Sequence, residues 1–337
     1  MYKLKEFITP PDLKDLNISV VIPNYNGAHL FPLTLPALLD ALRYSGKQFE
    51  IIVVDDCSTD DSVEYLQNNF PDISLLSNKL NSGFSKTINK GIFAAKHELV
   101  LLLNSDVKLS STYFTNQFHY FRISDTFGVM GKIIGWEDDI VQDAAKYPRF
   151  HGFKLKTSTN YLTDGKSEIY SMYLSGANAL VNREKLLLLG GFNELYSPFY
   201  MEDVDLCIRA WRIGWKCYFE PTSVCRHKTS SSIALKEKEI YIRTIYNRNK
   251  MYFHAIHLQG LTLLGWYIQT LSELLFRILT FRFDYLESFI AFLQNLKGVK
   301  VARTEFAQIS QKTQTEISLS SVVSLIQKGA LKKGPDY

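Results

Sequence analysis

The chain has 337 residues, of which 46% are hydrophobic and 21% are charged, so an ordinary globular protein is expected rather than a disordered one. A formal net charge of only +4, without a basic block interleaved with aromatic residues, argues against nucleic acid as a partner. The stretch MYKLKEFITPPDLKDLN contains no apolar segment of signal-peptide length, which favours a cytoplasmic protein. Reduced thiols would suit that compartment, and the spacing of the four cysteines with His227 matches no common zinc site.

Strands and helices are predicted to alternate from Ile18 onwards. Apolar runs predict strands over 18–22, 50–54, 73–76 and 99–103. Between them, helical spacing predicts helices over 33–44, from Ser58 or Thr59 to about 69, and over 84–95. This alternation is typical of a parallel sheet with right-handed crossovers.

The alternation breaks after Asp106. A helix is predicted near 111–122, followed by a strand over 128–134. The polar stretch 135–167 shows no clear periodicity, and long loops of this kind are usually lids or binding surfaces. A strand over 173–181 and a helix over 183–189 follow, and a further strand is predicted over 216–219.

The last hundred residues change in character. The 22 residues between Lys250 and Glu273 contain no Asp, Glu, Lys or Arg, but histidines, glutamines and glycines make a membrane span the less favoured interpretation. Apolar residues from Leu264 to Ile278 recur at helical spacing. We therefore expect an amphipathic helix there. Packing on the protein, formation of a homodimer and peripheral membrane contact all remain open for it.

Polar residues follow the predicted strands at their carboxyl ends, where open α/β sheets bind ligands. Those after the first, second and fourth strands are Pro23, Asn24, Tyr25, Asn26, Gly27, Asp55, Asp56, Asn104, Ser105 and Asp106. Hard oxygen ligands of this kind suit a divalent metal with a diphosphate. Asn81, Gly83 and Phe84 open a predicted helix whose N–H groups can meet an anion, and Asn89 lies within it. Each of these residues, taken alone, would equally suit a turn or a helix cap.

Acidic residues also open the predicted helix in MEDVDLCIRAW. Glu202, Asp203 and Asp205 are favoured there by the helix dipole, so their position alone does not distinguish catalysis from capping. Asp205 and Arg209 are four residues apart and are expected to form a structural pair. Trp211 and Trp215 are expected in the core rather than against a sugar.

Six segments, taken in order, resemble the blocks of family 2 glycosyltransferases. They are ISVVIPNYNG, VVDDCSTDDS, LNSGFSKTINKGI, LLLNSDV, SGANALVNRE and MEDVDLCIRAW, within residues 17–230. They are most similar to the bacterial rhamnosyltransferase-type branch that builds surface polysaccharides. The resemblance implies an α/β fold of GT-A type, Rossmann-like, with a mostly parallel central sheet flanked by helices over 17–235. A lead-in over 1–16 and a C-terminal helical extension over 236–337 complete the predicted organisation.

The resemblance also assigns roles to residues of this chain. The donor nucleotide would be bound by Pro23, Asn24, Tyr25, Asn26, Asp55, Asp56, Asn81, Gly83, Phe84, Asn89, Asn104 and Ser105. Asp56 would receive the base imide and the ribose, with Asp55 in support. Asp203 would be the catalytic base and Glu202 its supporting residue, while Gly176, Ala177 and Trp136 would line the acceptor side. Asp106 and His227 would approach the metal, Mg2+ or Mn2+; Asn104 departs from the family's usual Asp-x-Asp, which leaves Asp106 as the motif's one anionic ligand.

The implied reaction is an inverting, metal-dependent transfer of a sugar from a dTDP- or UDP-linked donor. The acceptor would be a hydroxyl of a saccharide or of a lipid-linked saccharide in bacterial polysaccharide synthesis, at the cytoplasmic face of the membrane or in the cytoplasm. A nucleotidyltransferase is a competing class, but its Gly-rich basic signature is not found in the sequence. A non-catalytic nucleotide-sugar-binding or scaffold protein is a second alternative, against which the intact Met201-Glu202-Asp203 argues.

Overall fold

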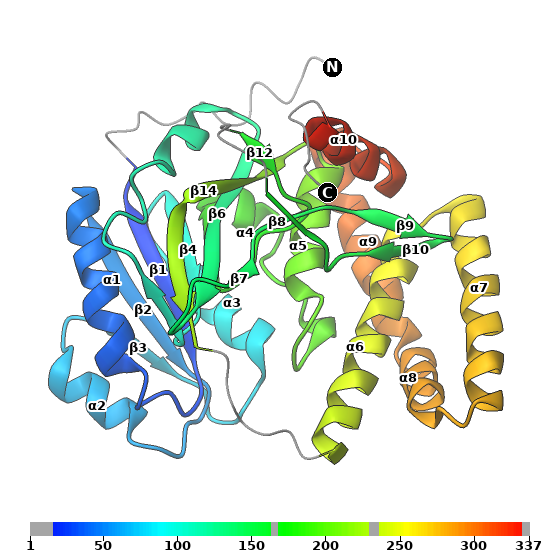
Figure 1. Cartoon of the computed structure of the whole chain (residues 1–337), viewed down its shortest axis with the longest axis horizontal. Helices are drawn as coiled ribbons and strands as arrows, with labels where there is room; N and C mark the ends of the chain where they lie inside the picture. Colours follow the sequence, from blue (N-terminus) through cyan, green and yellow to red (C-terminus); the bar gives the residue numbers. More distant parts are fainter. Residues whose placement is uncertain (1–15, 163–167, 229–235, 332–337) are drawn as a thin grey trace.

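A central mixed sheet flanked by helices organises the computed structural model, which describes residues 16–162, 168–228 and 236–331 (Figure 1). The first half follows the predicted alternation. Its strands are β1 (Ile18–Asn24), β2 (Phe49–Asp55), β3 (Ser74–Ser77) and β4 (Leu99–Leu103). Its helices are α1 (Phe31–Ser45), α2 (Ser62–Asn69) and α3 (Phe84–Ala94). These strands pair in parallel in the order β3-β2-β1-β4, and the predicted fold class is confirmed.

Alternating side chains of the central strands build a separate core on each face of this sheet. Val20 and Ile22 of β1 pack with Phe31 and other residues of α1, whereas Val21 between them packs against α3 on the other face. Strand β4 lies in the middle of the sheet and is buried along its whole length. Complete burial of such an aliphatic side chain contributes about 1.5–3 kcal/mol. The continuous apolar runs in the sequence therefore reflect strands covered on both faces.

The second half of the sheet is mixed in direction. Its strands are β5 (Val107–Leu109), β6 (Thr126–Gly135), β12 (Ile169–Tyr170), β13 (Asn178–Asn182) and β14 (Lys216–His227). Strand β13 runs antiparallel between β4 and β6, and β6 is parallel to β14. Helices α4 (Arg183–Leu188) and α5 (Glu202–Arg212) follow β13. In the described ranges, ten strands belong to this sheet.

The prediction of a helix near 111–122 is wrong. The chain makes a series of turns there and ends in a short 3-10 helix, η3 (Phe118–Arg122). The carbonyl of Tyr113, which an α-helix would need for its own ladder, accepts a hydrogen bond of 2.6 Å from the Ser223 hydroxyl. The Tyr113 hydroxyl in turn donates to the Asn178 carbonyl at 2.7 Å. Contacts with distant strands therefore override the local helical pattern.

The strand predicted over 173–181 begins only at Asn178. The Asn178 amide donates to the carbonyl of Ser175 at 3.2 Å and closes a turn before the strand starts. The carbonyl of Ala177 accepts from the Asn104 amide, also at 3.2 Å. This turn therefore ties the start of β13 to the end of β4, next to the motif Asn104-Ser105-Asp106.

The polar stretch that follows β6 folds into short strands. They are β7 (Val141–Asp143), β8 (Ala145–Lys146), β9 (Arg149–His151), β10 (Lys154–Lys156) and β11 (Asn160–Tyr161). β7 pairs with β6, and β9 and β10 form a hairpin that extends toward helix α7 (Gly260–Leu279) (Figure 1). The Phe153 amide at the tip of this hairpin donates to Gln269 Oε1 at 2.7 Å. The stretch is thus an ordered bridge between the sheet and the C-terminal helices.

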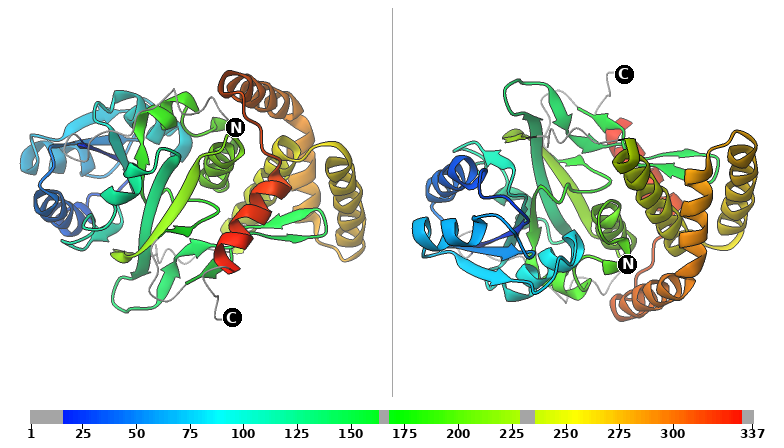
Figure 2. Two further views of the ribbon diagram at one scale, coloured as in Figure 1. Left: turned by 90° about the horizontal axis from the view of Figure 1, so that it is seen from above. Right: turned by 90° about the horizontal axis from the view of Figure 1, so that it is seen from below.

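Within residues 236–331, five helices lie beside the sheet. They are on the side away from β1 to β3 (Figures 1 and 2). Besides α7 they are α6 (Lys236–His257), α8 (Phe283–Gln294), α9 (Leu296–Thr313) and α10 (Leu319–Leu331). Trp266, Phe292 and Phe306 from these helices belong to the same hydrophobic core as Ile88 of α3. The C-terminal helices therefore complete one core of the α/β unit. The predicted boundary near 235 falls in a segment outside the described residues and stays a prediction.

Helix α7 contains the predicted amphipathic segment. The uncharged run 251–272 is divided between α6 and α7, and among the described helices none is long and apolar enough to cross a membrane. α7 buries Trp266, Thr270 and Leu274 against the protein. Its outward face exposes large apolar side chains, among them Leu261, Leu264, Ile268, Leu271, Leu275 and Leu279. Contact of this face with a membrane or with a second copy stays a prediction.

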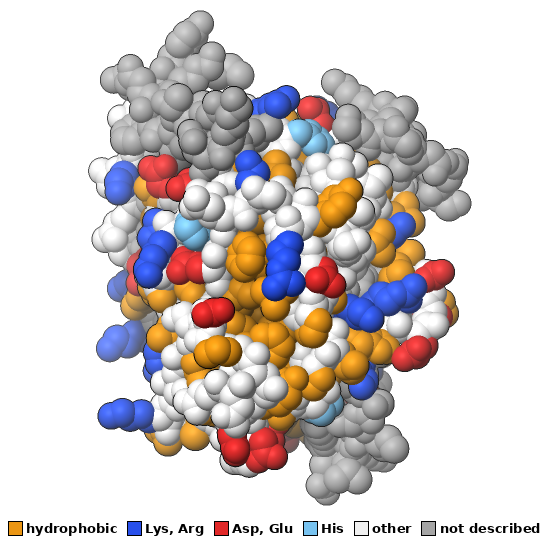
Figure 3. All heavy atoms as spheres, turned by 90° about the vertical axis from the view of Figure 1, so that its left-hand side faces the viewer, with side chains coloured by type: hydrophobic (Ala, Val, Ile, Leu, Met, Phe, Trp, Pro, Cys, Tyr) orange, Lys and Arg blue, Asp and Glu red, His pale blue; other side chains and the backbone are white. Residues whose placement is uncertain are grey.

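The surface on the opposite side of the molecule, which carries α1 and α2, differs from the apolar outward face of α7. Lys and Arg side chains lie there among Asp, Glu and uncharged side chains, and no extended field of one sign covers this face (Figure 3). This mixture agrees with the small net charge of the whole chain.

Candidate active site

A cavity of about 380 Å³ opens at the carboxyl ends of β1, β2 and β4. Its volume is in the usual range for a small-molecule site, about 300–1,000 Å³. The predicted donor residues that line it are Pro23, Asn24, Tyr25, Asp56, Asn81, Gly83, Phe84, Asn104 and Ser105, with Asp106 beside them. Thr87, Pro198 and Phe199 also line it and were not predicted. The structure thus brings most of the predicted donor residues to one cavity.

Asp55 and Asn26 support the cavity from behind rather than line it. Asp55 Oδ1 accepts from Asn24 Nδ2 at 3.0 Å and from the Ser58 hydroxyl at 2.5 Å. Asn26 Oδ1 accepts from the Thr59 amide at 2.8 Å. These bonds fix the loop after β1 against the loop after β2. This geometry is compatible with a supporting role for Asp55, and contact between Asn26 and a ligand stays a prediction.

Asp56 is buried and already holds part of the cavity wall in place. Its carboxylate accepts from the Asn78 amide group at 2.8 Å and from the backbone amides of Ser82 and Gly83 at 2.8 and 2.9 Å. Gly83 has a φ of 80°, a left-handed conformation that favours glycine. An ionised carboxylate offers about four acceptor positions. Asp56 therefore keeps room for about one further donor from a ligand.

The motif after β4 fits a divalent metal ion. Asn104 Oδ1 and Asp106 Oδ1 are buried and accept no hydrogen bond. Buried oxygens of this kind are costly unless a partner binds them, and two from one short loop are suitable hard ligands for Mg2+ or Mn2+. Among the described residues no group of three or more His, Cys, Asp or Glu side chains is arranged to hold a metal. The ion would therefore need further oxygens, which a diphosphate offers.

His227 lies at the end of β14, next to Asp106. Its Nε2 is 3.3 Å from Asp106 Oδ2, and its Nδ1 is 2.9 Å from Gln142 Oε1. The hydrogen bond with Asp106 raises the pKa of His227, although burial opposes the shift. In the neutral ring, the carbonyl oxygen of Gln142 keeps the proton on Nδ1, which donates to it. Nε2 then carries no proton and faces the acidic motif. The structure therefore brings the two predicted metal-side residues together.

Glu202 and Asp203 open helix α5. The residues before them, Tyr200 and Met201, both have a positive φ, 74° and 75°, which is uncommon outside glycine. Burial raises the pKa of both carboxyls, and the Asp203 charge raises the pKa of Glu202 further. Because Glu202 is shifted more, it is expected to hold a proton while Asp203 is ionised. That arrangement leaves Asp203 as the available base.

Two residues of the polar stretch complete the surroundings of Asp203. Asp143 raises the pKa of Asp203 by its charge and Lys146 lowers it, in addition to the effect of burial. Lys146 Nζ is 2.5 Å from Asp143 Oδ1 and 2.6 Å from Asn160 Oδ1. No sequence pattern marks this cluster, apart from the expectation that the stretch forms a lid or a binding surface.

The residues predicted for the acceptor side are divided between two places. Gly176 and Ala177 lie next to residues of the donor cavity: a Cβ on Gly176 would lie 3.3 Å from Phe84 Cζ, and the Ala177 carbonyl accepts from the Asn104 amide. Trp136 follows Gly135, the register partner of His227, and its ring centroid is 6.0 Å from Lys108 Nζ and 5.9 Å from Lys228 Nζ. The structure therefore supports close packing for Gly176, and it places two lysines near the ring of Trp136.

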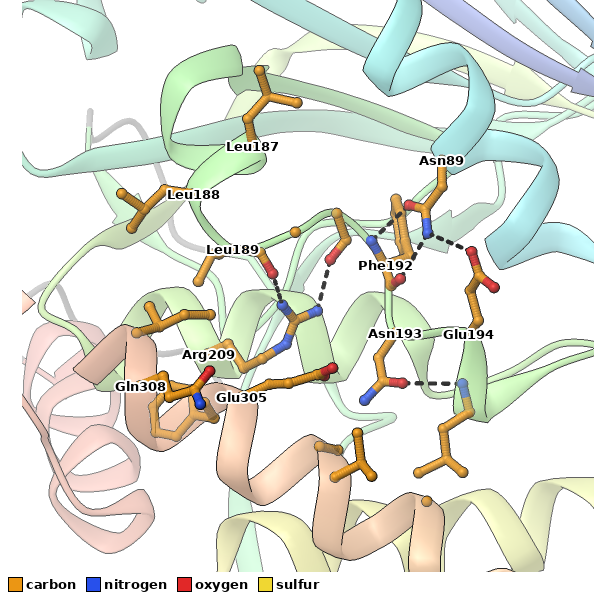
Figure 4. A pocket seen from close by; sticks show the side chains of 18 of the residues that line it. Asn89, Leu187, Leu188, Leu189, Phe192, Asn193, Glu194, Arg209, Glu305 and Gln308 are labelled. Carbon is orange, nitrogen blue, oxygen red and sulfur yellow. Dashed lines mark hydrogen bonds between the residues drawn. The ribbon is translucent and has the colours of Figure 1, made fainter. Parts of the chain in front are cut away.

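Asn89 lies outside the donor cavity, which corrects its predicted location. Its amide accepts from the Phe192 amide and donates to the Phe192 carbonyl, both at 2.8 Å (Figure 4). Together with Arg209 it lines a larger cavity of about 920 Å³ between the α4–α5 connection and α9. A Cβ on Gly191 would lie 2.5 Å from Asn89 Oδ1, so the glycine turn and the buried amide fit each other. Asn89 therefore holds α3 to the turn before α5.

Asp205 and Arg209 form the expected structural pair. Their side chains meet at 2.7 Å, and Asp205 also accepts from His257 Nε2 at 2.9 Å. Burial alone would raise the pKa of Asp205, but Arg209 and His257 outweigh it and lower this pKa to about 2. Trp211 and Trp215 are buried, as predicted. This network anchors α5, and hence Asp203, to the C-terminal helices.

Comparison with known proteins assigns the class. The family model "Glycosyl transferase family 2" matches residues 19–187, half of the chain. The chain belongs to this family. Two solved structures support the GT-A type of fold: GalNAc-T7 with UDP, GalNAc and Mn2+, and the mannosyltransferase PcManGT of Pyrobaculum calidifontis with GDP-Man and Mn2+. Their TM-scores are 0.54 and 0.51, each at 16% identity; the alignments cover 73% and 98% of this chain and 48% and 86% of theirs.

Curated relatives are similar over part of their length. The amylovoran biosynthesis glycosyltransferase AmsB of Erwinia amylovora is 27% identical over 226 residues, which is 60% of this chain and 67% of AmsB. An undecaprenyl-phosphate 4-deoxy-4-formamido-L-arabinose transferase of Pectobacterium carotovorum is 38% identical over 97 residues, 27% of this chain and 29% of the relative. The protein y4gI of Sinorhizobium fredii is 22% identical over 236 residues, covering 64% of this chain and 25% of y4gI. The chain thus spans less than a third of the length of these last two relatives.

Proposed function

We propose that the chain transfers a sugar from a dTDP- or UDP-linked donor to a hydroxyl of a saccharide or lipid-linked saccharide. The observation that carries this proposal is the cavity at the ends of β1, β2 and β4, whose lining residues include Asn104 and Asp106, each with a buried oxygen that accepts no hydrogen bond. In this proposal the nucleotide binds beside Asp56, and the diphosphate extends toward Asp106. The sugar then points to Asp203.

The chemistry is a single displacement. Asp203 takes the proton of the acceptor hydroxyl as that oxygen attacks the anomeric carbon, and the bond to the diphosphate breaks with its electron pair on the leaving oxygen. The configuration at the anomeric carbon is inverted, so an α-linked donor gives a β linkage and a β-linked donor an α linkage. Asn104, Asp106 and His227 would hold the Mg2+ or Mn2+ ion. When bound, the ion neutralises charge on the diphosphate.

The remaining residues orient the reactants. Asp55 and Asp56 hold the loops around the nucleotide, because each accepts several hydrogen bonds from these loops. Glu202, with its raised pKa, keeps a neutral carboxyl beside Asp203 and so adds no second charge. Gly176 packs closely against Phe84 of the donor cavity, and Ala177 and Trp136 are proposed to border the acceptor with it.

The pathway belongs to the proposal as well. The names of AmsB and of the undecaprenyl-phosphate transferase refer to surface polysaccharide and lipid-linked sugar chemistry, which supports a role in bacterial cell-surface polysaccharide synthesis. A rhamnose donor is favoured by the resemblance described above. Such a role would place the protein in the cytoplasm or at the inner face of the cell membrane.

A donor screen tests this proposal. The purified protein is incubated with Mn2+, a set of UDP- and dTDP-sugars that includes dTDP-rhamnose, and bacterial lipid-linked oligosaccharides. Release of nucleoside diphosphate and the mass of the product are measured. We expect transfer from one donor class and its loss in Asp203→Asn. Equal transfer by both proteins would contradict the proposed base, and absence of nucleotide binding would contradict the donor site.

A further inference from the structure

Four aromatic side chains form a cluster between the donor cavity and the solvent. Phe199 is 4.9 Å from Tyr200 and 6.5 Å from Tyr241 between ring centroids, and Tyr200 is 5.8 Å from Tyr246. The interplanar angles are 78°, 83° and 90°, so the rings meet edge to face. Phe199 and Tyr200 come from the segment before α5, and the other two come from α6. We call these four residues the aromatic cluster.

The aromatic cluster connects the donor site with the proposed base. Phe199 lines the donor cavity at one end of the cluster. Tyr246 lies at the other end. Burial raises the pKa of Tyr246, and the charge of the nearby Asp203 carboxylate raises it further. Tyr200 is three residues before Asp203 in the chain. A ligand resting on these rings would therefore reach both the donor sugar and the carboxylate.

Two rings of the aromatic cluster are exposed although they could have been buried. Tyr200 is 46% exposed and Tyr241 is 55% exposed. Phenol rings have an apolar face and a polar hydroxyl, and they offer contact area with few rotatable bonds. A pyranose ring has the matching character, with apolar C–H faces and a rim of hydroxyl groups. Exposed tyrosines beside a glycosyl-transfer site are therefore suited to stack on a sugar.

The backbone that presents Tyr200 is held in a strained conformation. Tyr200 and Met201 both adopt a positive φ, which is unfavourable for a residue other than glycine. The buried amide of Asn249 offsets this cost by donating to the carbonyls of Phe199 and Tyr200, both at 2.9 Å, and of Tyr196 at 2.6 Å. Arg248 adds a bond of 2.6 Å to the Ser197 carbonyl. The segment is thus fixed by α6, and the exposed ring is preorganised.

We propose that the aromatic cluster is the acceptor subsite, in which a pyranose ring of the acceptor saccharide stacks on Tyr200 and Tyr241 and directs its hydroxyl to Asp203. This inference rests on the proposed function and adds the residues that recognise the acceptor. It also explains why the tyrosines come from α6 as well as from the segment before α5: the subsite is complete only when the C-terminal helices are packed on the sheet.

Ligand-detected NMR tests the subsite with defined probes. Saturation transfer is measured for methyl glycosides of glucose, galactose, mannose, N-acetylglucosamine and rhamnose, in the presence of UDP, dTDP and Mn2+. The proteins are the wild type, the double variant Tyr200→Ala/Tyr241→Ala and the double variant Tyr200→Phe/Tyr241→Phe. Tyr44→Ala is the matched control, since Tyr44 is 64% exposed on α1, far from the cluster in sequence.

We expect the wild type to bind at least one glycoside. The alanine double variant should bind it about fivefold more weakly or worse, because two stacking contacts are lost. The phenylalanine double variant should keep most of the affinity, and Tyr44→Ala should keep all of it. No glycoside binding by the wild type, or equal binding by the alanine double variant, would overturn the subsite.

Calorimetric titration of the same samples with UDP and dTDP in the presence of Mn2+ separates this inference from the proposed function. Nucleotide binding should be the same in all four proteins, which also shows that the variants are folded. If nucleotide binds and sugar binding does not depend on the tyrosines, only the acceptor subsite is wrong. If the wild type binds neither nucleotide, the donor site itself is wrong.

Discussion

The donor side and the acceptor side of the site are built in different ways. The donor cavity is made at the ends of neighbouring parallel strands, and the hydrogen bonds of Asp55 and Asp56 that shape its loops stay within the first 110 positions. The surroundings of Asp203 combine β7, β8, α5 and α6, which are up to about a hundred residues apart. In the proposed function, a local frame would bind the donor nucleotide, and a composite of distant segments would face the acceptor.

The largest effect is expected from Asp203→Asn, which removes the proposed base and keeps the shape of the side chain. General base catalysis contributes about 10²–10⁴-fold, so the turnover number should fall by about a thousandfold. Nucleotide affinity should not change, because Asp203 does not line the donor cavity. Kinetics and calorimetry on one preparation check this. A turnover number within tenfold of the wild type would show that another group accepts the proton.

A substitution on the donor side should lower both the stability of the fold and the affinity for nucleotide. Asp56→Ala leaves the backbone amides of Ser82 and Gly83 and the side chain of Asn78 without their acceptor. The three donors are only partly buried, so each costs less than the roughly 1–3 kcal/mol of a fully buried donor, and the free energy of unfolding should fall by about 2–4 kcal/mol in total. Urea denaturation gives this value, and nucleotide affinity should fall too. The exposed neighbour variant Asp61→Ala is the control, and an equal loss in both would contradict the assigned role of Asp56.

Acid should destabilise the acceptor side first. Burial lowers the pKa of His254 to about 3 and that of His257 to about 4. In the unfolded chain both titrate near 6.5, so below that pH the unfolded state binds more protons and stability falls as the pH decreases toward 4. The loss should be about 1 kcal/mol per histidine for each pH unit below 6.5.

Urea denaturation at pH 7.0 and 5.5 measures this loss. His29 lies on the surface, so His29→Gln should leave the pH dependence of unfolding unchanged. The raised pKa values of Glu202 and Asp203 act in the opposite direction over this range, so the contribution of a buried histidine is measured with His254→Gln, which should lose less stability between pH 7.0 and 5.5 than the wild type. An equal change in both proteins would contradict the buried neutral state of His254.

The smallest effect is expected from Asp143→Asn. The charge of Asp143 raises the pKa of Asp203, so its removal should lower that pKa and move the acidic limb of the rate profile to lower pH, by less than about one unit. The maximal rate should change little, because Asp143 does not line the donor cavity. A shift to higher pH, measured from the pH dependence of the turnover number, would show that Asp143 acts on another group.

The sequence supported detailed prediction where structure is local. A continuous apolar run such as Val20-Val21-Ile22 predicts a strand buried on both faces, and polar residues at its end then fall at the ligand edge of the sheet. This reasoning placed Asp56 and Asp106 at the same edge of the sheet, and both line one cavity in the structure. It also found helix α7 from the spacing of its apolar residues.

Prediction from the sequence was poorer where distant contacts decide the conformation. The segment 111–122 has a helical pattern, but Ser223 takes the backbone carbonyl of Tyr113. Asn89 looked like a ligand residue because an amide inside a helix needs a partner, and that partner is the backbone of Phe192. No local sequence pattern marks Lys146, because its position near Asp203 depends on how β7 and β8 fold back toward α5.

Calorimetric titration with UDP and dTDP, with and without Mn2+, tests the donor site most directly. The wild type is compared with Asp106→Ala. The account predicts that one nucleotide binds to the wild type, that binding needs Mn2+, and that Asp106→Ala loses it. Binding that is equally strong without Mn2+ or in Asp106→Ala would contradict the assigned metal site, and absence of binding for both nucleotides would contradict the donor site as a whole.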